Sequence, residues 1–147
     1  VLQTNLDAAV FLTQSLHSAL SASGNARIVI VGSVAGSVPV MTGLPYALSK
    51  AALDQMTRYL AVEWARDGIR VNAVNPWYTR TPLAAPRLAD AAFTEKILAA
   101  TPNQRIADAE DVAGVVAALC LPALRHVTGQ CVAVDGGFSV ARAGFIP

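Results

Sequence analysis

Short runs of apolar, β-branched residues alternate with helical segments along this sequence, and the alternation restricts the folds open to it. The runs at residues 27–31, 69–74 and 130–134 have the length of strands, and the first is apolar on both faces. Such a run is typical of a strand buried in a parallel sheet that helices cover on both sides. Apolar residues at helical spacing predict helices at residues 2–20, 46–66, 91–100 and 109–121. Residues 79–88, which contain Pro82 and Pro86, are expected to form a loop.

Strands that alternate with helices in this order predict right-handed βαβ units and a parallel sheet with helices on both faces. We therefore assign the chain to the α/β class, as the C-terminal part of a doubly wound parallel-sheet domain of the Rossmann type. Residues 1–147 are expected to form a single partial domain, because the sequence shows only three strands and begins inside a helix. Asp108 is expected to cap the helix at 109–121.

Charged residues make up only 14% of the chain and hydrophobic residues 54%. An ordinary soluble domain has roughly 25% charged residues, so we expect another subunit or a missing segment to cover part of this surface. The net charge is +1, without a basic stripe, which argues against a nucleic-acid partner. Gly and Pro residues interrupt the long uncharged stretch at 28–49, and no signal peptide is evident, so we expect a soluble cytoplasmic protein without membrane association.

The two cysteines, Cys120 and Cys131, do not have the spacing of metal ligands, and no metal site is expected. Two buried free thiols fit a reducing compartment better than the single disulfide that remains possible.

Tyr46 and Lys50 lie four residues apart at the start of a predicted helix, so both side chains project from one face, one turn apart. A tyrosine phenol is a poor base at neutral pH, because it titrates near pH ~10. A neighbouring lysine ammonium favours the phenolate form, which suits a tyrosine that accepts and returns a proton.

Ser33 follows the first apolar strand, and in open α/β sheets ligands bind beyond the carboxyl ends of the strands. A hydroxyl group at that position can donate a hydrogen bond to a substrate carbonyl. Each of these residues alone is commonplace, because a helical Tyr and Lys pair or a serine in a turn usually has a structural role.

Five motifs occur together and in order, and they cover nearly the whole chain. They are Thr4-Asn5-Leu6, Gly32-Ser33-Val34-Ala35-Gly36, Tyr46-Ala47-Leu48-Ser49-Lys50, the stretch from Arg70 to Pro76, and Val134-Asp135-Gly136-Gly137. In this order they resemble the C-terminal portion of the short-chain dehydrogenase/reductase family.

That resemblance implies a catalytic role for Asn5, Ser33, Tyr46 and Lys50. Tyr46 would be the general acid in carbonyl reduction and the base in alcohol oxidation, and Ser33 would polarise the carbonyl. Lys50 would support Tyr46 and hold the nicotinamide ribose, while Asn5 would anchor a water that links Lys50 to solvent. The activity implied is hydride transfer between a small carbonyl compound or secondary alcohol and NADP or NAD, with NADP slightly preferred.

The segment after the second strand departs from the family pattern. Pro76-Trp77-Tyr78 stands where the family usually has Pro-Gly, and this resembles the tropinone-reductase-like branch. Trp77 could equally be a space-filling residue. By resemblance, Tyr46, Lys50, Pro76, Trp77, Thr79 and Thr81 would bind the cofactor. Residues 79–98 would form a mobile lid, whose apolar character suggests a modest, mostly hydrophobic substrate.

The family's Gly-rich phosphate loop does not occur in this sequence. We therefore expect the cofactor half to lie elsewhere and the isolated chain to be inactive. Two alternatives stay open: a reductase of 3-oxoacyl groups on acyl carrier protein, and a truncated, catalytically silent chain that serves only in association. The resemblance also implies a homodimer or homotetramer, formed through the helices at 2–20 and 46–66.

Overall fold

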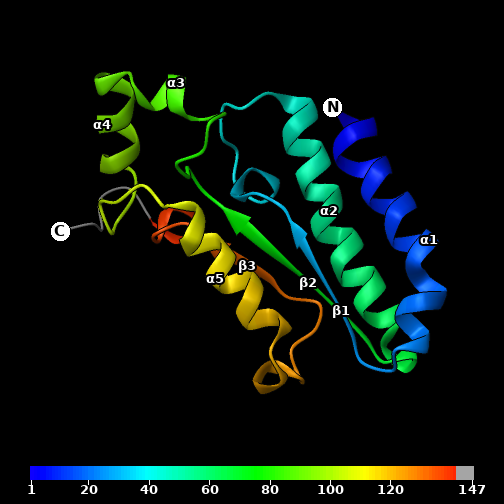
Figure 1. Cartoon of the computed structure of the whole chain (residues 1–147). Coiled ribbons are helices and arrows are strands. Elements are labelled where there is room, and N and C mark those ends of the chain that lie inside the picture. The colour runs from blue at the N-terminus through cyan, green and yellow to red at the C-terminus, as the bar shows by residue number, and fades with distance from the viewer. Residues whose placement is uncertain (142–147) are drawn as a thin grey trace.

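A three-stranded parallel sheet forms the centre of the computed structural model, which describes residues 1–141 (Figure 1). The strand order is β1-β2-β3, with bounds Ala26–Val31, Ile69–Pro76 and Cys131–Val134. Ala26 pairs with Ile69 at one end of the β1–β2 ladder, and Val31 pairs with Val74 at the other. The expected α/β fold with a parallel sheet is confirmed.

Five α-helices and several single turns precede, connect and follow the strands of the described chain. The α-helices are α1 (Ala8–Ala22), α2 (Leu44–Glu63), α3 (Ala85–Leu88), α4 (Ala91–Ala99) and α5 (Ala109–Cys120). The turns are η1 (Gln3–Asp7), η2 (Val34–Gly36), η3 (Ala65–Asp67), η4 (Pro122–Leu124) and η5 (Phe138–Val140). The prediction of a loop at 79–88 is wrong at its end, because α3 occupies the last four residues. Pro86 lies in the first turn of α3, where a missing N–H costs no helical hydrogen bond.

Alternate residues of β2 face the two helical layers. Ile69, Val71 and Ala73 pack on the α2 side, with Leu53 and Leu60 of that helix among the buried residues of the same clusters. Arg70 lies on the other face, where its guanidinium donates a hydrogen bond to the carbonyl of Leu119 in α5 at 2.9 Å. Figure 1 shows α1 and α2 together on one side of the sheet and α5 on the other.

This arrangement corrects the expectation that every βαβ unit is right-handed. The chain moves in the same direction across the sheet from β1 to β2 and from β2 to β3. The first connection runs through α2 and the second through α5, on the opposite face. Two crossovers that advance in one direction over opposite faces have opposite hands, so only one of them is right-handed.

Two burial expectations are also wrong. The apolar run at 27–31 was expected to be buried on both faces, yet Val31 is 54% exposed, because β1 lies at an edge of the described sheet. Central strand β2 has that character instead, with Val71, Ala73 and Val74 fully buried. Both cysteines are free, as expected, but Cys120 is exposed. Cys131 is half-buried, and this burial raises the pKa of its thiol to about 11.

None of the helices within residues 1–141 combines the length and apolar character needed to cross a membrane. Among the same residues, no three His, Cys, Asp or Glu side chains gather closely enough to hold a metal ion.

Candidate active site

Ser33 lies two residues after the end of β1, in extended conformation, and caps the start of the short turn η2. Its hydroxyl oxygen accepts a hydrogen bond from the N–H of Ala35 at 3.2 Å. Because a hydroxyl group can accept and donate at the same time, the Ser33 hydroxyl can still donate a hydrogen bond to another group. Ser33 lines a cavity of about 340 Å³ that Tyr46 also lines, and we call it the Tyr46 cavity.

Tyr46 lies in the first turn of α2 and Lys50 one turn later, as the spacing predicted. The Lys50 ammonium nitrogen lies 5.6 Å from the centroid of the Tyr46 ring and donates a hydrogen bond to the carbonyl of Val31 at 2.9 Å. Burial lowers the pKa of Lys50, and the nearby carboxylate of Asp54 opposes that shift. Lys50 stands beside Tyr46 but is not part of the cavity wall.

Asn5 belongs to the wide helical turn η1 and is connected to α2 through Ser49. The Asn5 amide donates to the Ser49 hydroxyl at 3.1 Å, and that hydroxyl donates to the carbonyl of Tyr46 at 2.7 Å. Ser49 is completely buried. Asn5 therefore braces the turn that carries Tyr46 and makes no direct bond to Lys50. Ser49 was not among the predicted site residues, and its one signal in the sequence is its place between Tyr46 and Lys50 in the motif.

The residues at the end of β2 enter the same cavity. Pro76, Trp77, Thr79 and Thr81 all line it, and Thr79 is held by a bridge to Ala107. Of the six residues expected to bind a cofactor, five share this wall, and Lys50 lies next to it. The residues come from separate elements that converge at the carboxyl end of the sheet.

Six further residues line the wall and were not among the residues expected to act in catalysis or cofactor binding. They are Val40, Thr42, Tyr78, Leu83, Ala84 and Arg87. Three of them belong to the segment 79–98, which lies beyond the carboxyl ends of β1 and β2 and contains α3 and most of α4 (Figure 1). Asp90 begins α4 by accepting hydrogen bonds from the N–H groups of Ala92 and Phe93. That this segment moves as a lid stays a prediction.

Trp77 belongs to a row of four aromatic rings, Phe138, Trp77, Tyr78 and Phe93, which we call the aromatic row. Trp77 stacks on Phe138 at a centroid distance of 3.6 Å, Tyr78 meets Trp77 edge-on at 4.7 Å, and Phe93 meets Tyr78 edge-on at 5.4 Å. The Trp77 indole N–H also donates to the Thr101 hydroxyl at 3.2 Å. Trp77 therefore fills space and lines the Tyr46 cavity at the same time, so the two expectations for it do not exclude each other.

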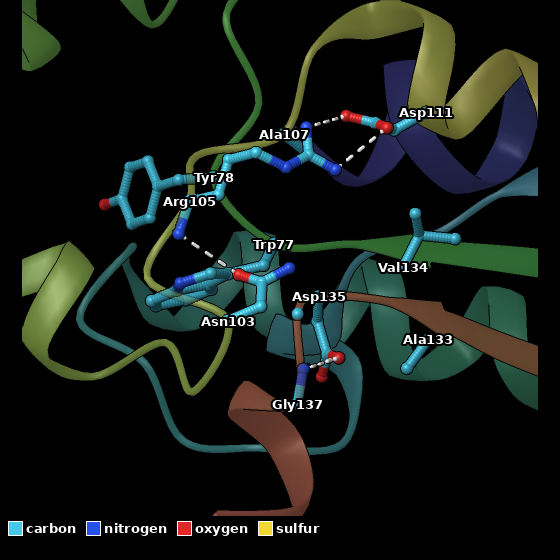
Figure 2. Close-up of a pocket in the computed structure, with 11 residues that line it drawn as sticks. Trp77, Tyr78, Asn103, Arg105, Ala107, Asp111, Ala133, Val134, Asp135 and Gly137 are labelled. Carbon is cyan, nitrogen blue, oxygen red and sulfur yellow. Dashed lines mark hydrogen bonds and ion pairs between the residues drawn. The ribbon is translucent and has the colours of Figure 1, made fainter.

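A second cavity, of about 400 Å³, shares Trp77 and Tyr78 with the first (Figure 2). We call it the Asp135 cavity. Its charged groups are bound to one another or to the main chain: Asp111 accepts two hydrogen bonds from Arg105, at 2.6 and 3.0 Å. Asp135 accepts from the N–H groups of Gly137 and Ser139. Burial alone would raise the pKa of Asp135, but these hydrogen bonds outweigh it and lower that pKa.

The capping of α5 involves this network. Asp111 accepts a third hydrogen bond, from the N–H of Asp108 at 2.8 Å, as in a capping box. Asp108 is the residue that precedes α5, as predicted, and its carboxylate lies 3.3 Å from Arg80. The polar groups of the Asp135 cavity thus hold loops together. The Tyr46 cavity, where Ser33 and Tyr46 meet, is the better candidate for chemistry.

Comparisons with known proteins identify the family. The family model described as Enoyl-(Acyl carrier protein) reductase matches residues 1–139. A tropinone reductase homologue of Arabidopsis thaliana is 46% identical over 140 residues, which are 95% of this chain and 53% of that protein. The chain spans about half the length of the curated relatives it matches.

Solved structures agree with the sequence matches. The TT0495 protein from Thermus thermophilus superposes with a TM-score of 0.90 at 39% identity, over 95% of this chain and 59% of that one. A gluconate 5-dehydrogenase from Burkholderia cenocepacia, in complex with NADP and tartrate, gives a TM-score of 0.89 at 32% identity, over 94% and 54% of the two chains. The chain belongs to the short-chain dehydrogenase/reductase family, as a tropinone-reductase-like member with a Rossmann-type fold.

Proposed function

We propose that this chain carries the catalytic half of an NAD(P)-dependent oxidoreductase that interconverts a carbonyl compound and a secondary alcohol. The observation that carries the proposal is the meeting of Ser33 and Tyr46 on one cavity wall, with Lys50 one helical turn from Tyr46. These groups come from the end of β1 and the start of α2, and the sequence contains all the residues of the family's catalytic motif.

In the proposed reduction, the Ser33 hydroxyl donates a hydrogen bond to the substrate carbonyl oxygen, keeps its own proton and orients that group. Tyr46 then gives its phenolic proton to the same oxygen, and the adjacent Lys50 ammonium stabilises the negative charge left on Tyr46. In oxidation the proton moves the other way. Asn5 acts indirectly, because its amide holds Ser49, which in turn holds the main chain of Tyr46.

The polar groups of the site fit the nicotinamide and ribose end of NADP or NAD. Lys50 and Tyr46 offer donors for ribose hydroxyls, and the main chain and hydroxyls at Thr79 and Thr81 offer partners for a carboxamide. When bound, the nicotinamide supplies or accepts the hydride. The slight preference for NADP is supported by the NADP complex of the Burkholderia cenocepacia relative.

The proposed assembly is a homodimer or homotetramer. Large apolar side chains stand exposed on α1 and α2: Phe11 is 74% exposed, Tyr59 63% and Val62 80%. Exposed apolar patches of this kind mark interaction surfaces, and a second copy of the chain offers a matching one.

The test uses a hybrid in which the upstream half of the Burkholderia cenocepacia dehydrogenase precedes Val1. We expect this hybrid to reduce small ketones with NADPH, and Tyr46→Phe to lower kcat at least about 100-fold, because general acid catalysis contributes roughly 10²–10⁴-fold. Ser23→Ala also removes a single hydroxyl, at an exposed position after α1 that lines neither cavity, and this control should keep kcat unchanged.

Two outcomes would contradict the proposal. A Tyr46→Phe hybrid with full activity would remove Tyr46 from the chemistry. A hybrid that folds and binds NADPH, yet turns over no ketone, would favour the catalytically silent alternative. If the hybrid reduced acetoacetyl groups on acyl carrier protein far better than free ketones, the acyl-carrier alternative would replace the general one.

A further inference from the structure

The Tyr46 cavity has one formally charged residue on its wall, and that residue is Arg87. The remaining lining is made of apolar, aromatic and hydroxyl side chains, without a carboxylate. Arg87 lies in α3 and enters the cavity from the segment 79–98, whereas Ser33 and Tyr46 come from the end of β1 and the start of α2. A cavity with a single positive group distinguishes between anionic and neutral ligands.

The guanidinium of Arg87 differs from those of its neighbours in having no anionic partner within residues 1–141. Arg80 donates to the carbonyl of Ile106 and lies against Asp108, and Arg105 is bound to Asp111 by two hydrogen bonds. The charge of Arg87 is therefore available to a ligand.

The aromatic row holds Arg87 in position. The guanidinium carbon lies 4.6 Å from the centroid of the Phe93 ring, which is the last ring of the row. A cation–π contact uses the face of the guanidinium and leaves its N–H edges free to donate. The row passes from Phe93 through Tyr78 to Trp77 at the end of β2, so the position of Arg87 is tied to the sheet. Trp77 and Tyr78, which belong to the stretch that departs from the family's usual Pro-Gly, therefore support the position of Arg87.

We propose that Arg87 determines substrate class by binding a carboxylate, so that the substrate is a small keto acid or the corresponding hydroxy acid. The inference rests on the proposed function, because it assigns the carbonyl to Ser33 and Tyr46 and the carboxylate to Arg87. A guanidinium matches a carboxylate with two parallel hydrogen bonds, and the apolar wall suits the short carbon chain between the two groups. Arg87 is exposed, so water competes for it and the preference is moderate.

The test measures binding to the 147-residue chain without cofactor, by NMR titration. The probes are 4-oxopentanoate and 2-pentanone, which have the same carbon skeleton and differ in one terminal group. We expect the wild-type chain to bind 4-oxopentanoate about fivefold more tightly, the upper range for exposed ion pairs, and Arg87→Gln to abolish that preference. Arg87→Lys should keep part of it, because lysine keeps the charge but not the planar fork.

Arg66→Gln is the matched control, since it removes one exposed arginine outside the cavity and should leave the preference unchanged. An equal preference in wild type and Arg87→Gln would overturn the proposal, as would a failure of both probes to bind saturably. Tighter binding of dihydroxyacetone phosphate than of 4-oxopentanoate would replace the carboxylate by a phosphate and also overturn it. The proposed function is tested by a different measurement, the turnover of the Tyr46→Phe hybrid. The preference for an anion is measured by binding alone, so either proposal can fail without the other.

Discussion

The two cavities beside Trp77 have similar volumes but differ in what their polar groups do. In the Asp135 cavity, Arg105, Asp111 and Asp135 satisfy one another and the adjacent main chain. In the Tyr46 cavity, Arg87 has no anionic partner in the described chain, and the hydroxyl proton of Ser33 is not needed for the bond to Ala35. A larger and more polar cavity is therefore not the better site, because paired charges stabilise loops and unpaired ones are left for ligands.

Trp77→Ala should have the largest effect on stability, because Trp77 belongs to both walls. We expect a loss of about 3 kcal/mol in the free energy of unfolding, at the lower end for a tryptophan truncation, since the ring is only half-buried. Chemical denaturation measures it. Trp77→Phe keeps an aromatic ring against Phe138 and loses the bond to Thr101, so it should cost less. Equal stability of Trp77→Ala and wild type would show that the shared wall is not structural.

Gly136→Ala tests the Asp135 cavity alone. Gly136 has a φ of +62°, and an added Cβ would meet the side chain of Asn103. The left-handed backbone costs an L residue about 1–2 kcal/mol, and we expect that loss in thermal or chemical unfolding. Gly114→Ala in α5 is the control: open space surrounds that position, and alanine should stabilise the helix by about 0.5–1 kcal/mol. Unchanged chemistry at Tyr46 in the Gly136→Ala hybrid would support the separation of the two cavities.

Acid titration gives the smallest expected effect. The hydrogen bonds from Arg105 hold the pKa of Asp111 at about 2, below its ordinary 3.8. A lowered carboxylate pKa stabilises the folded state fully above pH 3.8, and this contribution is lost as the pH falls through about 2. Asp111→Asn should therefore lose less stability than wild type between those values, as followed by circular dichroism. Glu110→Gln is the control, because Glu110 has no ion pair in the described chain, and it should lose as much stability as wild type over this pH range. If Asp111→Asn lost as much stability as Glu110→Gln, the Arg105–Asp111 pair would contribute nothing.

The sequence predicted well whatever depends on local pattern. The strands at 69–74 and 130–134 and the turn shared by Tyr46 and Lys50 follow from residue spacing, and the structure has them close to the expected positions. The convergence of Ser33 with Pro76 and Thr79 follows from parallel strands that end at one edge of the sheet.

The errors concern properties that depend on tertiary context. Pro86 suggested a loop, although a proline is equally suited to the first turn of a helix such as α3. The exposure of Val31 depends on how many strands flank β1, and the hands of the crossovers depend on which face α5 occupies. Arg87 lies in the segment 79–98 that was expected to cover the substrate, but the sequence did not single it out, because its proposed role arises only from the ring of Phe93 and the shape of the cavity.

The aromatic row links substrate binding at Arg87 to a part of the chain that is distant from the residues proposed for proton transfer. Its far end is Phe138, in the turn after β3, while the residues proposed for proton transfer lie after β1 and on α2. A substitution at Phe138 would shift Trp77, Tyr78 and Phe93 in sequence and so move the cation at Arg87 without touching Ser33 or Tyr46. A substitution at Phe138, outside the Tyr46 cavity, is therefore expected to change which substrates bind while Ser33 and Tyr46 stay in place.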